Sequence, residues 1–346
     1  MLNNKFIFFA IFSLILICTT LKASEKHNIK LEIRSLNSSI KLGDPVPIEF
    51  KITNVGEKDY EYTNRNYDRS GRMPEYRLEA FHAKGLKLDD PRESIKWLYM
   101  GGLGAQSNIK PKEYYTKVID LNRWVLIEKS GVYKIVGDYK GVKSEFIEIK
   151  IAERSASEME QYIEKLGDEL TIGKDKNKRE DLLKKLMYTQ STSIISYILD
   201  STYKDENYFW VQEAFFYYLP KNEQVKKLVL NTNKINGIGG GMTAVLHKLG
   251  IDESIMKELI DYSLDLKNKI VISEAVLAAQ RYQDEKFLER LINISKSKDY
   301  DYVVRIRSLY AMEKFKDHEE VKSTLWNLRN DEDEFIRETV TRIIDE

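Results

Sequence analysis

The chain has 346 residues, of which 55 are lysine or arginine and 55 are aspartate or glutamate. Because the two signs balance, the sequence shows no electrostatic footprint for nucleic acid or for an anionic membrane surface. Cys18 is the only cysteine. A disulfide within the chain is therefore excluded, and stability must come from apolar cores, for which the length is ample.

The N-terminus predicts export. Residues 1–5 end in a positive charge at Lys5, and residues 6–17 contain no charged side chain. This apolar run has the length of a signal-peptide core and is shorter than the ~20 residues of a membrane-spanning helix. We expect residues 1–23 to be a signal peptide that is cleaved after Ala23, which predicts a periplasmic or surface-exposed protein.

Cys18 leaves a second interpretation of this segment open. Cleavage before Cys18 and attachment of lipid there would anchor the protein to a membrane. The preceding residues 15–17 read Ile-Leu-Ile, whereas a lipoprotein signal usually has a small residue directly before its cysteine.

Residues 24–152 alternate between apolar and polar side chains, as half-buried strands do. Ile29, Leu31 and Ile33 alternate with charged residues, and residues 46–53 do the same after a Gly-Asp-Pro turn. We expect strands over residues 29–34, 46–53, 76–82, 95–100, 114–121, 131–139 and 144–151. About seven short strands in one segment predict a β-sandwich.

Two stretches of this segment resemble bacterial immunoglobulin-like domains. Residues 42–54 are similar to the second strand of such domains, and residues 130–135, Ser-Gly-Val-Tyr-Lys-Ile, place Tyr133 where the corner tyrosine stands. The resemblance implies that Ile135 occupies the position of the second cysteine. It also implies that apolar packing of Ile135 against Phe50 or Ile52 replaces the inter-sheet disulfide.

Two parts of the sandwich segment are predicted loops. Residues 60–74 are mostly polar, and residues 97–104 read Trp-Leu-Tyr-Met-Gly-Gly-Leu-Gly. Trp97 and Tyr99 could form an aromatic recognition loop, because these rings give a large contact area. The alternative is a core strand that ends in a flexible turn.

Two overlapping Ser-x-x-Glu capping boxes, Ser155 with Glu158 and Ser157 with Glu160, predict a helix directly after the last strand. We expect this helix to end near Gly167, followed by a polar loop, and repeats from Arg179 onward.

Residues 153–346 repeat a small residue at positions 214, 244, 275, 308 and 339, in steps of 30, 31, 33 and 31. An atypical first copy has Asp181 at this position. The next residue is apolar in all six copies: Leu182, Phe215, Val245, Val276, Leu309 and Val340. Such a period predicts an α-solenoid of about six helical hairpins, the last one truncated.

This half resembles HEAT-repeat proteins, in particular the short-repeat bacterial kind related to phycobilin lyases. The resemblance is carried by residues 299–305 and 330–337, in which an acidic turn precedes an apolar residue and an arginine, Arg305 and Arg337. It implies a scaffold or binding surface and only rarely an enzyme.

No residue set indicates chemistry. The histidines, His27, His82, His247 and His318, have no metal-ligand spacing, and no Gly-x-Ser-x-Gly motif occurs. Residues 236–241, Asn-Gly-Ile-Gly-Gly-Gly, lack the Lys-Ser/Thr ending of a phosphate loop, and we interpret them as a flexible turn between repeats. We assign no catalytic residue, metal ligand or cofactor.

Aromatic residues are dense between positions 203 and 218, and four of them are candidate partner-binding residues with Trp97 and Tyr99: Tyr208, Trp210, Tyr217 and Tyr218. Burial of these aromatic residues against the sandwich is the alternative. Equivalent surface positions of the second helices read Lys226, Lys257, Glu289 and Ser323 along one line and Lys227, Glu258, Arg290 and Thr324 along the next. Neither line keeps a single charge sign, which argues against a basic stripe. The sequence therefore predicts an exported, non-catalytic binding or scaffold protein whose partner is a protein or a glycan and not nucleic acid. The alternative is a lyase-like HEAT-repeat enzyme or an accessory factor of an enzyme.

Overall fold

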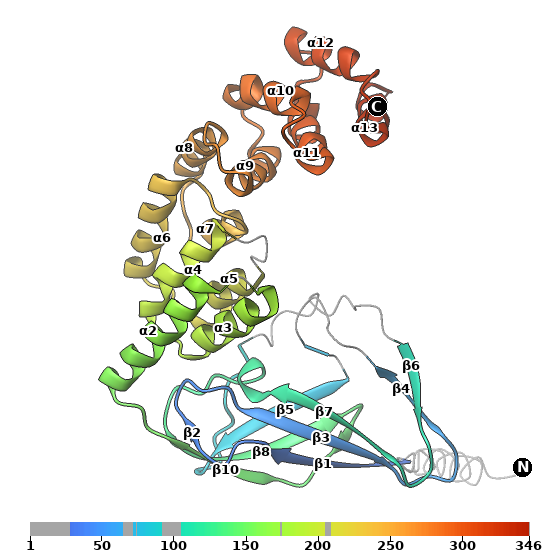
Figure 1. The fold of residues 1–346 in the computed structure, drawn as a ribbon, viewed down its shortest axis with the longest axis vertical. Coiled ribbons are helices and arrows are strands. Elements are labelled where there is room, and N and C mark those ends of the chain that lie inside the picture. The colour runs from blue at the N-terminus through green and yellow to red at the C-terminus, as the bar shows by residue number, and fades with distance from the viewer. Residues whose placement is uncertain are drawn as a thin grey trace, which may run out of the picture. The chain divides into compact units, whose positions relative to one another are not determined.

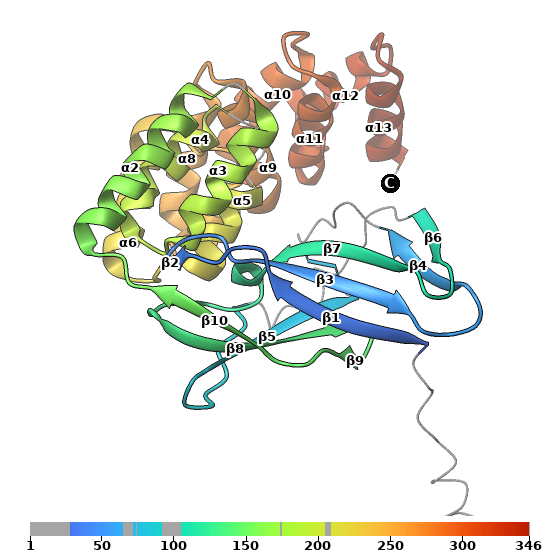
Figure 2. The same cartoon turned by 60° about the horizontal axis from the view of Figure 1, so that its bottom comes forward.

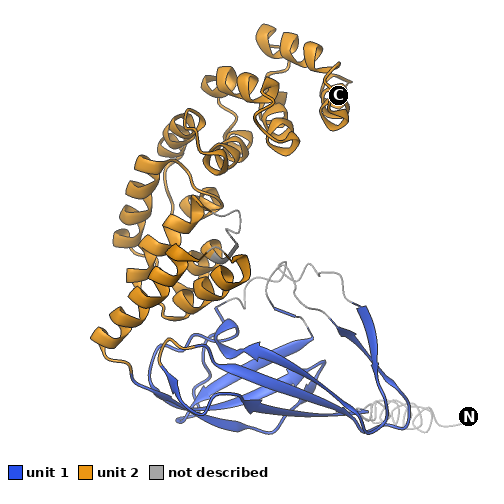
Figure 3. Ribbon diagram, viewed as in Figure 1, with its two compact units in different colours: residues 1–41, 45–153 blue, residues 42–44, 154–346 orange. Residues whose placement is uncertain are grey.

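The computed structural model describes residues 28–64, 72–73, 75–91, 105–173, 175–204 and 209–345. The chain divides into two compact units (Figure 3). Unit 1 takes the residues up to 41 together with 45–153, and unit 2 takes residues 42–44 and 154–346. Strands build unit 1 and helices build unit 2 (Figure 1), so the protein is a multidomain protein of mixed β and α structure.

Unit 1 contains two larger sheets and a two-stranded ribbon. The first sheet has the order β1 (Ile29–Ser35), β3 (Pro47–Asn54), β7 (Tyr114–Asp120). The second has the order β2 (Ile40–Lys41), β10 (Ile147–Ala152), β8 (Gly131–Tyr139), β5 (Tyr76–His82), with β9 (Val142–Lys143) beside β8. The ribbon pairs β4 (Tyr60–Asn64) with β6 (Ala105–Ile109). All pairs are antiparallel except β2 with β10.

The two larger sheets lie one over the other (Figure 2) and bury their facing side chains. In β3 the apolar residues Ile48, Phe50 and Ile52 are fully buried, and the polar residues between them are half-buried, as the alternation predicted. The sheets approach closely at Gly137, where a Cβ atom would come within 2.7 Å of Ile33 and 2.9 Å of Phe50.

The expected strands over residues 76–82 and 131–139 are confirmed as β5 and β8. The expected loop over residues 60–74 is wrong at its start, because residues 60–64 form β4. Its backbone pairs with β6, which no local pattern indicated because both strands are largely polar. The strand expected over residues 95–100 lies outside the described residues.

In unit 2, helices alternate between two layers (Figure 1). The first-helix layer contains α3 (Lys176–Tyr188), α5 (Phe209–Glu213) with the π-helix Ala214–Tyr218 that continues it, α7 (Met242–Lys248), α9 (Lys269–Tyr282), α11 (Tyr302–Met312) and α13 (Glu334–Asp345). The second-helix layer contains α2 (Ala156–Ile172), α4 (Ile195–Thr202), α6 (Glu223–Asn236), α8 (Glu253–Leu264), α10 (Leu288–Lys296) and α12 (Glu319–Leu328). Each member of the first-helix layer contacts the next one.

The repeated apolar position explains this packing. All six of its residues, Leu182, Phe215, Val245, Val276, Leu309 and Val340, are at most 3% exposed. The preceding small residues Ala275 and Ser308 are fully buried, which lets neighbouring helices approach. Asp181, at the same position of the first copy, is exposed and pairs with Lys185 at 2.6 Å.

Helix α2 begins as predicted and ends later than predicted. The Ser155 hydroxyl accepts from the Glu158 amide and the Glu158 carboxylate accepts from the Ser155 amide, which completes the expected capping box. However, the helix continues through Gly167 to Ile172, and α3 begins at Lys176, before the expected Arg179. Gly167 lies against the Tyr197 ring, which a Cβ atom would approach to 2.2 Å. This glycine therefore allows close packing and does not end the helix.

Within the described ranges, no helix combines the length and the apolar character needed to cross a bilayer.

Candidate partner-binding surface of unit 2

The glycine-rich turn between α6 and α7 is tightly held, so its interpretation as a flexible turn is wrong. Ile238 is fully buried, and its amide donates to the Ser263 hydroxyl at 2.9 Å. The amides of Gly241 and Thr243 donate to the two carboxylate oxygens of Glu274, both at 3.0 Å. Backbone amides that a phosphate loop would offer to an anion are therefore occupied by a carboxylate of the chain itself.

The turn requires glycine for two physical reasons. Gly237 and Gly241 have φ angles of 79° and 74°, which side chains rarely adopt. Gly239 lies so close to Thr202 that a Cβ atom would come within 2.1 Å of its hydroxyl oxygen. Sequence reasoning recognised the glycines but not the partner of the turn, because Glu274 lies more than thirty residues away in α9.

Beside Glu274, a cavity of about 440 Å³ opens between α9 and α11. Its apolar lining comes from Ile270, Val303 and Val304. Its polar lining comes from Gly240, Lys269, Ser273, Glu274, Tyr300, Asp301 and Arg307. Burial, with a smaller contribution from the charge of Asp299, raises the pKa of Tyr300, so its hydroxyl stays protonated at neutral pH and can donate a hydrogen bond.

The two acids of the cavity are engaged with backbone amides. Glu274 binds the start of α7, as described above, and Asp301 accepts from the Val304 amide at 2.9 Å as the N-cap of α11. The Lys269 ammonium donates to the Asp299 carbonyl at 2.8 Å. The half-buried Arg307 side chain, in contrast, has no hydrogen bond or ion pair with any residue in the described part of the chain.

An exposed apolar patch adjoins the cavity, and we define it as Tyr302, Val303 and Phe335. Their exposures are 46%, 38% and 56%. The rings of Tyr302 and Phe335 stack with a centroid distance of 5.2 Å and an interplanar angle of 25°. Val303 belongs both to the patch and to the cavity lining, so the two features are continuous.

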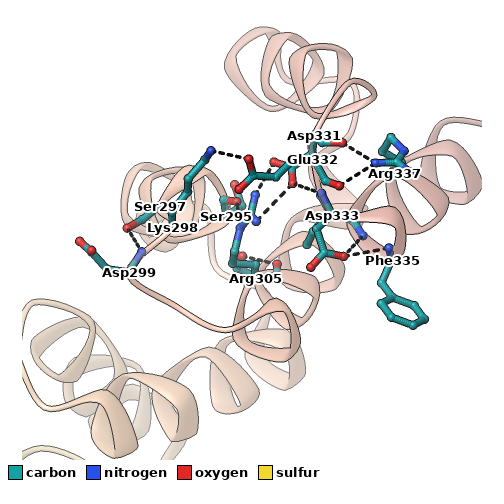
Figure 4. A network of polar contacts seen from close by, with 12 residues as sticks. Ser295, Ser297, Lys298, Asp299, Arg305, Asp331, Glu332, Asp333, Phe335 and Arg337 are labelled. Atoms are coloured by element: carbon teal, nitrogen blue, oxygen red, sulfur yellow. Dashed lines mark hydrogen bonds and ion pairs between the residues drawn. The ribbon is translucent and has the colours of Figure 1, made fainter.

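Arg305 fixes the helices that carry this patch (Figure 4). Its Nε donates to the Ser295 carbonyl at 2.9 Å, and its Nη2 lies 2.5 Å from the Asp331 carboxylate. The two side chains are only 5% and 9% exposed, so this ion pair is nearly dry. Arg337, one period later, instead donates to the carbonyls of Asp331 and Glu332 at 2.7 and 2.9 Å.

Of the candidate aromatic residues from the sequence, Tyr217 and Tyr218 have described side chains, and neither belongs to this patch. Tyr218 is 5% exposed and packs 6.1 Å from the Tyr188 ring, so it is a core residue and cannot serve as a surface anchor. Tyr217 is half-buried, with its ring 6.0 Å from Phe216. Trp97, Tyr99 and Tyr208 lie outside the described residues, as does the side chain of Trp210, whose backbone belongs to α5.

Sequence reasoning did not single out Tyr302, Val303, Phe335 or Arg307. A usable signal was present, because Val303 and Phe335 each stand two residues before the arginine of their repeat. Both positions point to solvent, whereas the following residues Val304 and Ile336 are buried.

Two cations of the second-helix layer, Lys257 and Arg290, have acidic partners. Lys257 lies 2.9 Å from Glu253 and 3.2 Å from Asp284, and Arg290 lies 2.7 Å from Asp265. Thr324, which we expected on the surface line, is 1% exposed and belongs to the core. No group of histidine, cysteine, aspartate and glutamate that could hold a metal ion occurs among the residues that the structure describes.

No family model and no curated protein matches this chain. Human deoxyhypusine hydroxylase in complex with glycerol is similar over 54% of this chain and 73% of its own, with 12% identity and a TM-score of 0.29. The β-glucosidase of Listeria innocua in complex with isofagomine is similar over 36% of this chain, with 9% identity and a TM-score of 0.23. The β-glucosidase EmGH1 of Erythrobacter marinus is similar over 36% of this chain, with 10% identity and a TM-score of 0.23. The chain spans only 16% of either β-glucosidase, and likenesses of this size carry no argument about function.

Proposed function

We propose that the chain is an exported, non-catalytic binding or scaffold protein that acts at the cell envelope, and that its partner is a protein. In this proposal unit 1 is an immunoglobulin-like sandwich and unit 2 is a HEAT-like solenoid. The export part of the proposal is supported by the apolar run of residues 6–17 behind Lys5.

Two features support the immunoglobulin-like assignment. The Tyr133 hydroxyl donates to the Lys129 carbonyl at 2.5 Å, the backward bond of a corner tyrosine. Ile135 stands where the second cysteine would be and is fully buried, as are Phe50 and Ile52. The solenoid assignment is supported by the two helix layers and by the repeated buried position.

The observation that carries the binding function is the apolar patch of Tyr302, Val303 and Phe335 together with the cavity beside it. A folded chain gains free energy by burying such rings, and contiguous exposed apolar surface marks interaction sites. The surrounding charges are mixed, and the cations Lys257 and Arg290 already have partners, which supports a protein partner rather than a nucleic acid.

Affinity capture from envelope fractions tests the proposal. The wild-type chain and the Trp326→Ser variant should retain the same envelope partner, because Trp326 is an exposed ring on the second-helix layer, away from the patch. The Tyr302→Ser/Phe335→Ser variant should lose this partner. If the double variant retained the partner, the patch would not be the binding site.

Fractionation of the producing cell tests export separately. We expect the chain in the periplasm or at the surface, with its leader removed. Uncleaved chain in the cytoplasm would contradict the proposal, and turnover of a substrate without any partner would favour the enzyme alternative.

A further inference from the structure

We propose that the cavity between α9 and α11 binds a peptide segment through a carboxylate, which Arg307 receives, while the apolar patch of Tyr302, Val303 and Phe335 binds a neighbouring apolar side chain. This inference rests on the proposed function, because it names the partner chemistry of the same surface.

Arg307 offers a charged contact in the cavity. Its half-buried side chain belongs to the cavity lining, and its guanidinium, with five hydrogen-bond donors, has no acceptor among the described residues. Neighbouring arginines of the same unit do have acceptors: Arg305 binds Asp331 and Ser295, and Arg290 binds Asp265. The donors of Arg307 are therefore open to a ligand, and a carboxylate matches its planar fork with two parallel hydrogen bonds.

The charges that line the cavity are balanced. The carboxylates of Glu274 and Asp301 face the amide ends of α7 and α11, whose partial positive charge offsets them. Among the described residues, Lys269 binds the neutral Asp299 carbonyl and no carboxylate, so its charge remains available to an anion. The hydroxyls of Ser273 and Tyr300 add further donors to the lining. The formal charges of Glu274 and Asp301 balance those of Lys269 and Arg307, so the cavity has no net positive charge that would favour a doubly charged phosphate over a singly charged carboxylate.

The apolar patch continues into the part of the cavity that Arg307 lines. Val303 and Arg307 are one helical turn apart on α11 and both line the cavity, so an apolar group at the patch and a carboxylate at Arg307 can belong to one short segment. A peptide with aspartate or glutamate close to a large apolar residue has this pattern. Binding of such a peptide to the patch would bury the stacked rings of Tyr302 and Phe335.

The experiment selects peptides from a random display library on the purified chain. We expect enrichment of sequences in which an acidic residue lies near a large apolar one. The best peptide is then synthesised and titrated by calorimetry. Arg307→Gln should weaken its binding by about tenfold or more, the size of a lost charge-assisted hydrogen bond. Lys296→Gln, the same loss of charge at an exposed site on α10, should leave the affinity unchanged.

A second peptide, with asparagine or glutamine in place of the acid, completes a double-mutant cycle. It should bind the wild-type chain about tenfold less tightly, and it should bind the Arg307→Gln variant no worse than the acidic peptide does. If thermal unfolding shows that the Arg307→Gln variant is not folded, the Arg307→Lys variant is used instead. That variant keeps the charge but loses the fork, so we expect a smaller loss of affinity.

The outcomes separate this inference from the proposed function. Enriched peptides without acids, or acidic peptides that bind the Arg307→Gln variant as tightly as the wild type, would overturn the role of Arg307 and leave a peptide-binding protein. If millimolar inorganic phosphate displaced the bound peptide as well as free acidic peptide does, the cavity would be a general anion site. That result would also contradict this inference. Failure of both the peptide selection and the envelope capture would remove the proposed function as well.

Discussion

Arg305 joins α11 to the end of α10 and to the turn before α13. Its side chain is only 5% exposed, and its guanidinium lies between the Ser295 carbonyl and the Asp331 carboxylate (Figure 4). A buried ion pair adds little net stability over apolar packing, yet loss of one partner leaves an uncompensated charge. The role of the pair is thus to fix the arrangement of α11 and α13, and with it the stacked rings of Tyr302 and Phe335.

We expect Asp331→Ala to lower the free energy of unfolding by about 3–5 kcal/mol, because Arg305 would keep its charge in a dry site without a counter-ion. Urea denaturation of the two proteins measures the difference. Lys298→Ala is the matched control, since Lys298 and Glu332 form an exposed pair with 70% and 69% of their side chains accessible. That control should cost at most about 1 kcal/mol. If the two changes lowered the free energy of unfolding equally, burial of the Arg305 pair would not increase the cost of losing its carboxylate.

The same pair predicts how stability depends on pH. Burial alone would raise the pKa of Asp331, but hydrogen bonds from Arg305 and from the Asp333 amide, together with the charges of Arg305 and Lys298, hold it below its ordinary value of 3.8. A carboxyl whose folded pKa is lowered stabilises the fold above its ordinary pKa, and this contribution is lost as the pH falls through the folded value.

We therefore expect the stability difference between the wild type and Asp331→Asn to be constant from neutral pH down to the ordinary pKa of 3.8 and to shrink below it. Urea midpoints at a series of pH values provide the measurement. A difference that grows on acidification would show that the folded pKa of Asp331 is raised and not lowered.

At the scale of elements, Gly167 in α2 is an exception to the rule that glycine destabilises a helix relative to alanine. Gly167→Ala should destabilise unit 2 by about 1–3 kcal/mol, although alanine is the better helix former, because the new Cβ atom would stand 2.2 Å from the Tyr197 ring. In a Tyr197→Ala background the sign should reverse, and alanine should then stabilise by about 1 kcal/mol. Thermal unfolding of the four proteins gives the cycle, and an unchanged sign would mean that the ring does not set the preference.

Glu274 is a second residue that connects two elements, because its carboxylate on α9 binds backbone amides at the start of α7. Glu274→Ala should cost about 1–3 kcal/mol or more, because the amides of Gly241 and Thr243 would be left buried without an acceptor. Glu258→Ala removes an exposed carboxylate from α8 and should change stability by less than about 0.5 kcal/mol. Amide hydrogen exchange localises the effect: faster exchange at Gly241 and Thr243 is expected, and unaltered protection there would contradict this role.

At the scale of the whole molecule, the two units have separate cores, one between sheets and one between helix layers. We expect a fragment of residues 154–346 to give the circular dichroism of a mainly helical protein and to unfold cooperatively. This follows because the apolar contacts of the helices, including the six repeated positions, are made inside unit 2. A fragment spectrum dominated by strand or by unfolded chain would show that the helices need unit 1 to fold.

The features that the sequence determined by itself are those that neighbouring residues encode. Alternation with a period of two placed β5 and β8, the Ser155 capping box started α2, and the apolar position that recurs through the six copies is buried in each of them. Each of these signals lies within a few residues of the element it specifies, because strand pleat, helix capping and helix period are local properties of the backbone.

Only the tertiary structure decided the features that depend on distant partners. The pairing of β4 with β6, the close contact of Gly167 with Tyr197 and the occupation of the glycine turn by Glu274 join residues that are far apart in the chain. The candidate site follows the same rule. Arg307 and Arg305 are both arginines of α11, yet the fold gives Arg305 a carboxylate and places Arg307 at an open cavity. A one-dimensional pattern records that an arginine is present, but the surroundings of its charge are set by packing between helices.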